Sequence, residues 1–168
     1  MTGWFRRGER SASAMPLRRF NRLSTTDATT LLHRCLGVER WVRTVVAARP
    51  YRHLDDLFEA ARDAAFPFTA AELEAALATL DPPQVVPPAR LYESPRDTLL
   101  REQLDGAVTQ YQHRFGRPFL TRTDGKAATQ VLVELWERLG HDIDTEDRIL
   151  AQQVRQTALL TLARLVSD

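Results

Sequence analysis

Acidic side chains stand on both sides of a proline-rich stretch, and such carboxylates could carry acid–base chemistry. Asp81 precedes a proline, Asp97 follows a Ser-Pro pair, and Glu102 comes five residues later. Two carboxylates in unequal surroundings can divide into a general acid and a general base, because burial raises the pKa of one of them. The alternative for each aspartate is structural, since Asp97 would cap a helix and Asp81 would end one beside proline. The residues alone leave both interpretations open.

Positive charge for an anionic substrate could come from Arg90 and Arg96, which flank the same stretch, although solvated arginines are the alternative. Other site chemistries lack their motifs. The four histidines have no partner at metal-ligand spacing, and the chain has no GxGxxG, no P-loop and no nucleophile elbow. The sequence therefore predicts neither a metal site nor a cofactor.

Composition indicates one globular domain. The 168 residues are 43% hydrophobic and 27% charged, and no window approaches the 18 apolar residues of a membrane span. Cys35 is the only cysteine, so we expect no disulfide, a cytoplasmic setting and a buried thiol.

Six arginines stand in residues 1–22 against one glutamate. Residues 1–17 are predicted to form a flexible basic arm, with contact to nucleic acid or an acidic partner as the alternative.

Helix start and stop signals follow one another along the rest of the chain. Ser24 and Thr69 each stand three residues before an acid, as in a capping box. Gly37 and Gly116 follow apolar-periodic stretches, where a left-handed glycine would end a helix. Helices are expected over 25–36, 38–48, 53–64, 70–80, 95–114, 126–139 and 145–166. The last has one apolar stripe, Leu150, Val154, Ala158, Leu162 and Leu165. Residues 117–125 are expected to be extended. The prediction is an all-α single-domain bundle of seven or eight helices.

Two groups of residues have a spacing shared with a known family. The first is Phe20, Asn21, Leu31, Leu32, Cys35, Arg40, Trp41, Arg49, Pro50 and Tyr51. The second is Tyr111, Phe115, Gly116, Phe119, Gly125 and Lys126. Together they resemble the 2-oxo-4-hydroxy-4-carboxy-5-ureidoimidazoline (OHCU) decarboxylases of purine catabolism, and the likeness runs from about residue 20 to 166. The resemblance implies an OHCU decarboxylase-like helical domain over residues 18–168, with most matched residues, Trp41 among them, in its core.

The family decarboxylates a polar ureidoimidazoline without metal or organic cofactor. It uses a histidine in an H-P motif, the Glu-Gln pair of S-x-x-E-Q, and an arginine on the last helix. Here the histidine position falls at Leu80 or Asp81, and the arginine position falls at Thr161. The S-x-x-E-Q pattern falls either on residues 94–98 or on the later pair Glu102-Gln103. The resemblance thus implies candidate catalytic residues Asp81, Asp97 and Glu102.

The same resemblance implies where a substrate would bind. In the family, backbone groups of the extended stretch hold the ureido-ring amides, and residues 117–125 match that stretch. Backbone recognition survives side-chain change, so a small cyclic or amide-rich ligand is expected here; a plain connection between two helices is the alternative. The implied substrate-binding residues are Pro82, Ser94, Gln103, Phe119, Leu120 and Thr161.

The substituted positions shape the functional hypotheses. Aspartate lacks the charge switch of histidine near neutral pH, and threonine lacks the bidentate cation of arginine. Each loss costs on the order of a hundredfold in rate. The leading hypothesis is a cofactor-free lyase of this fold, repurposed for another small polar substrate in a bacterial biosynthetic pathway. A true OHCU decarboxylase with relocated catalytic groups and a non-catalytic binding protein are the alternatives. Family members are often dimers, so a homodimer is expected, without membrane or nucleic-acid partners.

Overall fold

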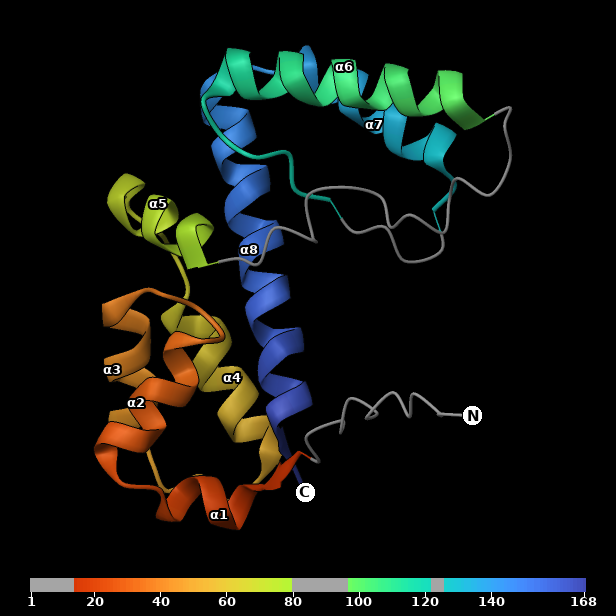
Figure 1. Ribbon diagram of the computed structural model, residues 1–168. Helices are drawn as coiled ribbons and strands as arrows, with labels where there is room; N and C mark the ends of the chain where they lie inside the picture. The colour runs from red at the N-terminus through yellow and green to blue at the C-terminus, as the bar shows by residue number, and fades with distance from the viewer. Residues whose placement is uncertain (1–13, 80–96, 122–125) are drawn as a thin grey trace, which may run out of the picture.

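The computed structural model describes residues 14–79, 97–121 and 126–168 (Figure 1). These residues form eight helices: α1 (Leu17–Arg22), α2 (Thr25–His33), α3 (Glu39–Ala47), α4 (Leu54–Ala64), α5 (Ala70–Thr79), α6 (Asp97–Phe115), α7 (Ala128–Leu139) and α8 (Ile143–Leu165). Two short strands, β1 (Met15–Pro16) and β2 (Val166–Ser167), pair in parallel and bring the two ends of the described chain together. The all-α prediction is confirmed.

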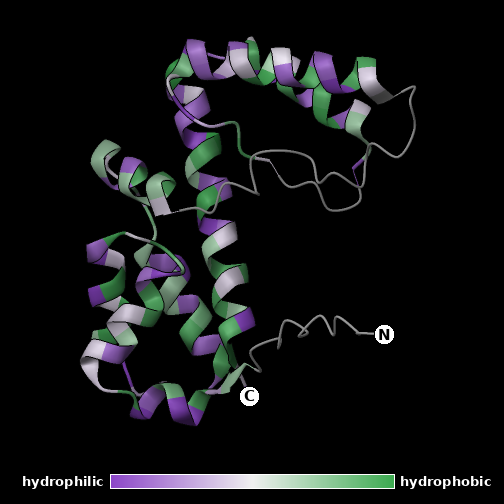
Figure 2. Cartoon of the chain, viewed as in Figure 1, coloured by the Kyte–Doolittle hydropathy of each residue, from purple (hydrophilic) through white to green (hydrophobic). Residues whose placement is uncertain are grey.

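Helix α8 is the long axis about which the other elements are arranged. In Figure 1, α1 to α4 lie around its C-terminal half, α6 and α7 lie across its N-terminal end, and α5 lies between these groups. Hydrophobic and hydrophilic residues alternate along α8 in Figure 2, as one apolar stripe on a helix requires. Four residues of the predicted stripe are buried: Leu150, Val154, Ala158 and Leu162.

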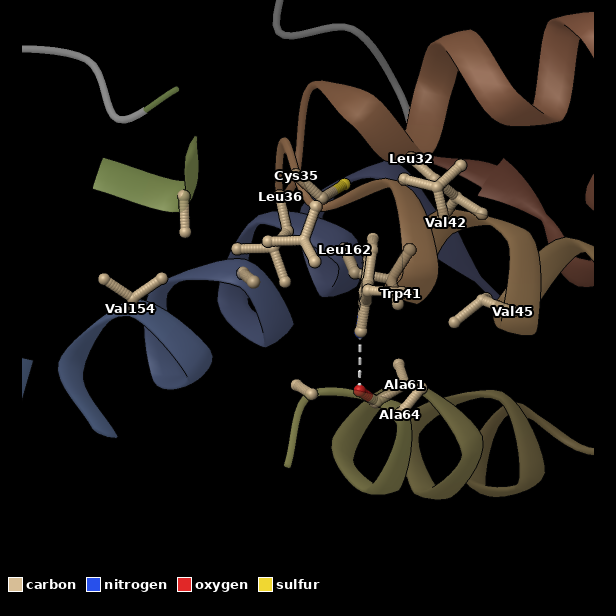
Figure 3. Packing of buried hydrophobic residues seen from close by; sticks show 14 of the residues in the cluster. Leu32, Cys35, Leu36, Trp41, Val42, Val45, Ala61, Ala64, Val154 and Leu162 are labelled. Carbon is tan, nitrogen blue, oxygen red and sulfur yellow. Dashed lines mark hydrogen bonds between the residues drawn. The ribbon is translucent and has the colours of Figure 1, made fainter. Parts of the chain in front are cut away.

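Two apolar clusters follow from this arrangement. The larger joins α1 to α5 with the stripe of α8, and Trp41 lies within it (Figure 3). Trp41 is fully buried, and its indole N–H donates to the carbonyl oxygen of Ala61 at 2.6 Å, which satisfies its polar atom. Cys35 is buried in the same cluster, as expected. The smaller cluster lies between α6 and α7 and contains Tyr111 and Phe119.

The capping signals are confirmed at two helix starts. Ser24 Oγ accepts from the N–H of Asp27 at 3.0 Å before α2. At α5 the bonds are reciprocal, because Thr69 Oγ1 accepts from the N–H of Glu72 and the Glu72 carboxylate accepts from the N–H of Thr69 at 2.9 Å. These local bonds fix where the helices begin independently of the core.

The prediction for Gly37 is wrong. Among the described residues only Gly116 has a positive φ, of 64°, where it ends α6 as expected. Gly37 is instead required by close packing, because a Cβ at this position would lie 1.9 Å from Thr79 Oγ1 of α5. The structure also adds β1 and α1, which were not expected. Residues 15–17 therefore belong to the folded domain, with Leu17 buried, rather than to the arm assigned to residues 1–17.

Candidate functional site

The segment 117–121 follows the left-handed turn at Gly116 and passes the N-terminal half of α8 without regular secondary structure (Figure 1). It lies between the two apolar clusters, since Phe119 belongs to the smaller and Leu120 to the larger. Three polar contacts hold it, one near each end and one at Leu120. A backbone held in this way has its geometry set before any ligand binds.

The first contact is the side chain of Arg117, which bridges two helices. Its Nη2 lies 3.1 Å from Glu74 Oε1 of α5, and its Nη1 lies 2.6 Å from Asp147 Oδ1 of α8. Nη1 makes no aligned hydrogen bond, so its contact with Asp147 is electrostatic. The guanidinium is largely shielded from solvent, but the Glu74 carboxylate is 60% exposed, so solvent screens that pair more than the pair with Asp147.

The second contact is made by Arg138, near the end of α7. Its Nη1 donates to the carbonyl oxygen of Leu120 at 2.5 Å. The guanidinium also lies over the rings of Phe119 and Tyr111, with its central carbon 4.6 and 5.4 Å from the ring centroids. Phe119 and Tyr111 meet edge to face at 5.2 Å. Arg138 thus fixes both the backbone and the aromatic side chain of the segment.

Glu146, in the first turn of α8, neutralises Arg138. Arg138 Nε donates to Glu146 Oε1 at 2.7 Å, the Tyr111 hydroxyl donates to the same oxygen, and His141 Nδ1 lies 3.2 Å from Oε2. Burial raises the pKa of Glu146, but the hydrogen bonds from Arg138 and Tyr111 outweigh it, so the net pKa is below its ordinary value. Burial raises the pKa of Tyr111 above its ordinary range. The glutamate is therefore an anion and the tyrosine a neutral donor.

The third contact holds the C-terminal end of the segment. Thr121 Oγ1 donates to Glu134 Oε1 at 2.7 Å, and Lys126 Nζ lies 2.5 Å from Glu134 Oε2 and 3.2 Å from Thr121 Oγ1. Glu134 also lies 3.8 Å from Arg138 Nη1, so the second and third contacts are joined. α7 thus holds the segment at Leu120 and at Thr121.

This arrangement can bind a ligand more readily than it can react with one. Its titratable groups are paired with each other, and none of the paired groups described above is placed as a free acid or base. Outside helices and strands, the backbone hydrogen bonds among the described residues include none from the N–H groups of Phe119, Leu120 or Thr121. Peptide N–H groups fixed in one orientation can bind a carbonyl, a ring amide or a developing oxyanion.

The residues predicted to bind or react lie at different places. Phe119 and Leu120 are brought together with Tyr111 and Arg138, and both residues are buried, with exposures of 1% and 2%. Thr161 is half-buried on α8, fifteen residues beyond Glu146, which is about 22 Å along the helix axis. Asp81, Pro82 and Ser94 lie outside the described residues. Asp97 is the first residue of α6, and its side chain also lies outside the description.

Glu102 and Gln103 are not brought to the segment. Both are exposed on α6 and line a groove of about 310 Å³ between α6 and α7, together with Gly106, Ala107, Gln110, Leu132 and Trp136. Gln103 and Tyr111 are eight residues apart, about 12 Å along the helix. A substrate bound beside Phe119 would therefore lie more than two helical turns from this pair, and the catalytic role assigned to Glu102 stays a prediction.

Sequence reasoning missed Arg138 and Glu146, although a signal for them exists. Arg138 continues the buried stripe of α7 that contains Val131 and Leu135, and Glu146 stands four residues before Leu150 on the stripe of α8. A charged residue at a position that belongs to the apolar stripe of a helix is either exposed after all or is buried with a partner of opposite charge. Two such residues on consecutive helices, of opposite sign, predict a buried ion pair.

In the ranges 14–79, 97–121 and 126–168, no cluster of three or more His, Cys, Asp or Glu residues could hold a metal ion. None of the helices described here is long and apolar enough to cross a membrane.

Comparison with known proteins identifies the family of this chain. The family model described as OHCU decarboxylase matches residues 21–81 and 91–163. The chain belongs to the OHCU decarboxylase family. The match includes α2 to α7 and most of α8, and so contains the segment Arg117–Thr121 and the residues that hold it. No curated protein matches the chain.

A solved structure shows the OHCU decarboxylase-like fold independently. The crystal structure of an (S)-allantoin synthase is similar to this chain with a TM-score of 0.67 and 13% sequence identity, over 90% of this chain. At that identity the likeness concerns the fold alone. The match covers 54% of the other chain, so this protein spans about half the length of that relative.

Proposed function

We propose that this protein is a cofactor-free lyase of the decarboxylase type, acting on a small polar substrate bound beside residues 117–121. The family and the fold support a lyase role of this type. The observation that carries the proposal is the segment itself, because Arg138 and Glu134 hold Leu120 and Thr121 in a fixed course while the side chains of Phe119 and Leu120 point into the core. Binding of the ligand is assigned to peptide groups of this segment.

The proposed reaction needs three functions. The bond between the reacting carbon and the carboxylate carbon breaks, carbon dioxide leaves, and the electron pair stays on the substrate. Fixed N–H donors stabilise the oxygen or nitrogen onto which that pair is delocalised, and an acid then protonates the carbon. The peptide groups of residues 119–121 are proposed for the first role. Asp81 and Asp97 are proposed for the acid and base, with Pro82 and Ser94 beside the substrate, whereas Thr161 lies too far along α8 to contact a substrate at this segment.

The substrate is proposed to differ from OHCU itself. Leu80 or Asp81 stands where the family has histidine, and Thr161 stands where it has arginine. An enzyme without a cation at the latter position binds a carboxylate less strongly in the same pose, because the bidentate contact is lost. We infer a substrate recognised mainly through amide and carbonyl groups, in a cytoplasmic bacterial biosynthetic pathway. Genes for such a pathway beside the coding gene would support this assignment.

The direct test measures carbon dioxide release from freshly prepared OHCU and from a panel of small carboxylated cyclic ureides. Turnover of a panel compound at least tenfold above that of OHCU, without added metal or cofactor, would support the proposal. Ligand binding is measured in parallel by NMR, with the amide signals of residues 119–121 as the probe. Absence of turnover together with absence of shifts at these amides for the whole panel would refute it.

Substitution of each aspartate in turn tests which of them acts as the acid. Asp81→Asn and Asp97→Asn each remove one carboxyl proton donor with little change in size, and Asp63→Asn on the exposed surface of α4 is the matched control. A loss of about a hundredfold in kcat for one aspartate variant, with the control unchanged, is expected for a group that protonates the product carbon. Equal activity of all three variants would remove both aspartates from the reaction.

A true OHCU decarboxylase is the second candidate, because the family model that matches carries that description. This alternative assigns the chemistry to Glu102 and Gln103. It requires rapid formation of allantoin from OHCU and loss of that activity in Glu102→Gln. If neither OHCU nor the panel is turned over but one of them binds, a non-catalytic binding protein is the remaining assignment.

A further inference from the structure

A groove of about 510 Å³ lies between α4 and the C-terminal part of α8. Its apolar lining includes Phe58 of α4 and Leu159 and Leu160 of α8, and Asp55 and Glu59 of α4 add charge. Leu160 is 43% exposed, although Phe58 and Leu159 pack partly against the larger apolar cluster. An apolar groove with charged residues at its border is the kind of surface that another segment of protein covers.

The fold fixes where residues 1–13, which precede the described chain, enter the domain. β1 pairs with β2 directly after α8, so Met15 lies opposite Val166. Leu160 stands six residues before Val166, which is about 9 Å along the helix axis. Figure 1 shows α4 beside this end of α8. Residues 4–13 can span at most about 33 Å, so the groove is within their reach.

The residue types of the preceding segment match those of the groove. Residues 4–7 read Trp-Phe-Arg-Arg, which places two aromatic side chains directly beside two guanidinium groups. On α4, Phe58 is followed by Glu59, and Asp55 stands one turn before Glu59 on the same face. Aromatic side chains could therefore cover the apolar lining while the neighbouring guanidinium groups pair with the two carboxylates.

The charges of the two segments are also complementary. Residues 1–13 contain three arginines and one glutamate, whereas α4 contains four acidic residues and one arginine. Asp55, Glu59 and Asp63 follow one another at intervals of four residues, where like charges repel. Within residues 14–79, 97–121 and 126–168, none of these three carboxylates has an ion-pair or hydrogen-bond partner. Arginines from the preceding segment would relieve that repulsion.

We propose that residues 4–10 occupy the groove between α4 and α8 of their own chain. The two aromatic side chains cover Phe58 and Leu160, and the arginines pair with Asp55 and Glu59. The apolar lining, the entry point beside the end of α8 and the opposite charges all favour this occupant. The inference is independent of the proposed reaction, because the groove is formed by other residues than the segment 117–121.

The test is photo-cross-linking of the full chain with p-benzoylphenylalanine in place of Phe5. After irradiation, mass spectrometry locates the cross-linked residues, and denaturing electrophoresis separates links within one chain from links between two. We expect links within one chain, to residues 55–62 of α4 and 159–163 of α8. Absence of a cross-link, or links to other elements, would overturn the proposal. Links only between two chains would equally overturn it.

Charge-reversal variants test the pairing. Asp55→Arg with Glu59→Arg should lower the cross-link yield about fivefold, and Arg6→Glu with Arg7→Glu should do the same, because each replaces attraction by repulsion. All four changes together should restore at least about half of the yield, since the charges are then exchanged. The matched control is Asp105→Arg with Glu137→Arg, on exposed positions of α6 and α7, which should have no effect.

Circular dichroism of each variant should show the same helix content and melting temperature, so that a lower yield is not caused by unfolding. If the yield falls equally in the control, or stays unchanged in both charge reversals, the pairing of arginines with Asp55 and Glu59 is wrong and the proposal is overturned.

Discussion

Arg138 and Glu146 form an ion pair inside the protein, with side-chain exposures of 3% and 1%. The two residues stand on either side of the turn between α7 and α8, and Arg138 also donates to the carbonyl oxygen of Leu120. One guanidinium therefore joins the end of α7, the start of α8 and the segment 117–121. The pair determines the course of the segment beside which the proposed substrate would bind.

Removing one member of this pair should lower the stability of the folded protein. Arg138→Met leaves Glu146 buried without its main counter-charge, and we expect a loss of about 3–5 kcal/mol in the free energy of unfolding. Urea denaturation measures this directly. The matched control is Arg43→Met, which breaks an exposed 3.9 Å pair with Glu39 and should cost less than about 1 kcal/mol.

A double variant separates the charge from the packing. Arg138→Met combined with Glu146→Leu removes both charges, so it should be more stable than Arg138→Met alone. If the single variant costs no more than the surface control, Glu146 is solvated in the free protein and the buried-pair description fails.

The lowered pKa of Glu72 predicts that the folded protein loses stability in acid. The hydrogen bond from Arg40, followed by that from the Thr69 N–H, lowers the pKa of Glu72 from 4.5 to about 2. A carboxyl whose pKa is lower in the folded state stabilises the protein fully above its unfolded pKa, and that stabilisation is lost as the pH falls from about 4.5 toward 2. The loss should be about 1–2 kcal/mol, because the Arg40 side chain is 40% exposed and solvent screens the pair.

The measurement is the unfolding free energy of the unchanged protein and of Glu72→Gln between pH 2 and pH 6. The difference between them should be largest near pH 6 and should shrink below pH 4.5. A difference that stays constant over this range would show that Glu72 stabilises the connection between α4 and α5 through packing rather than through its charge. Arg40 also donates to the carbonyl oxygens of Ala64 and Pro67 at 2.8 Å, so Arg40→Ala should cost more than Glu72→Gln.

Cys35 should be unreactive in the folded protein. The thiol is buried, and burial raises its pKa to about 12, so almost no thiolate is present at pH 8. We expect less than a tenth of the protein to react with a disulfide reagent within an hour at pH 8, and one equivalent to react at once in urea. Rapid reaction of the native protein would mean that the α2–α3 region opens readily.

Gly37 should tolerate no side chain while Thr79 is present. Gly37→Ala places a Cβ 1.9 Å from Thr79 Oγ1, and relief of that contact by movement of α5 should cost about 1–3 kcal/mol. Thr79→Ala alone removes a hydroxyl and a methyl group from an exposed residue and should cost little. The double variant should recover most of the loss, which makes the test a coupling measurement by thermal or urea denaturation. If the effects of Gly37→Ala and Thr79→Ala on the free energy of unfolding simply add, the two residues are not in contact.

Much of the local structure was determined by the sequence itself. The capping residues Ser24 and Thr69 and the stripe of α8 identified helices whose observed bounds agree within a few residues, because hydrogen bonds at helix ends and apolar periodicity act over one or two turns. The residues shared with the family identified the fold, which the family match confirms. Cys35 and Trp41 were assigned to the core for the same reason.

Tertiary structure decided what depends on contacts between distant residues. Gly37 is required by Thr79, forty-two residues away, and no local pattern distinguishes that requirement from a left-handed helix end. The partners of Arg138 come from three separate segments, so the identity of these partners became visible only when α6, α7 and α8 were placed together. Likewise, the sequence made Glu102 a catalytic candidate and Gln103 a substrate-binding candidate, and only the packing of α6 places both beside Gly106 and Trp136 rather than beside Phe119. Spacing along a chain fixes which face of a helix a residue occupies, but only packing decides what that face meets.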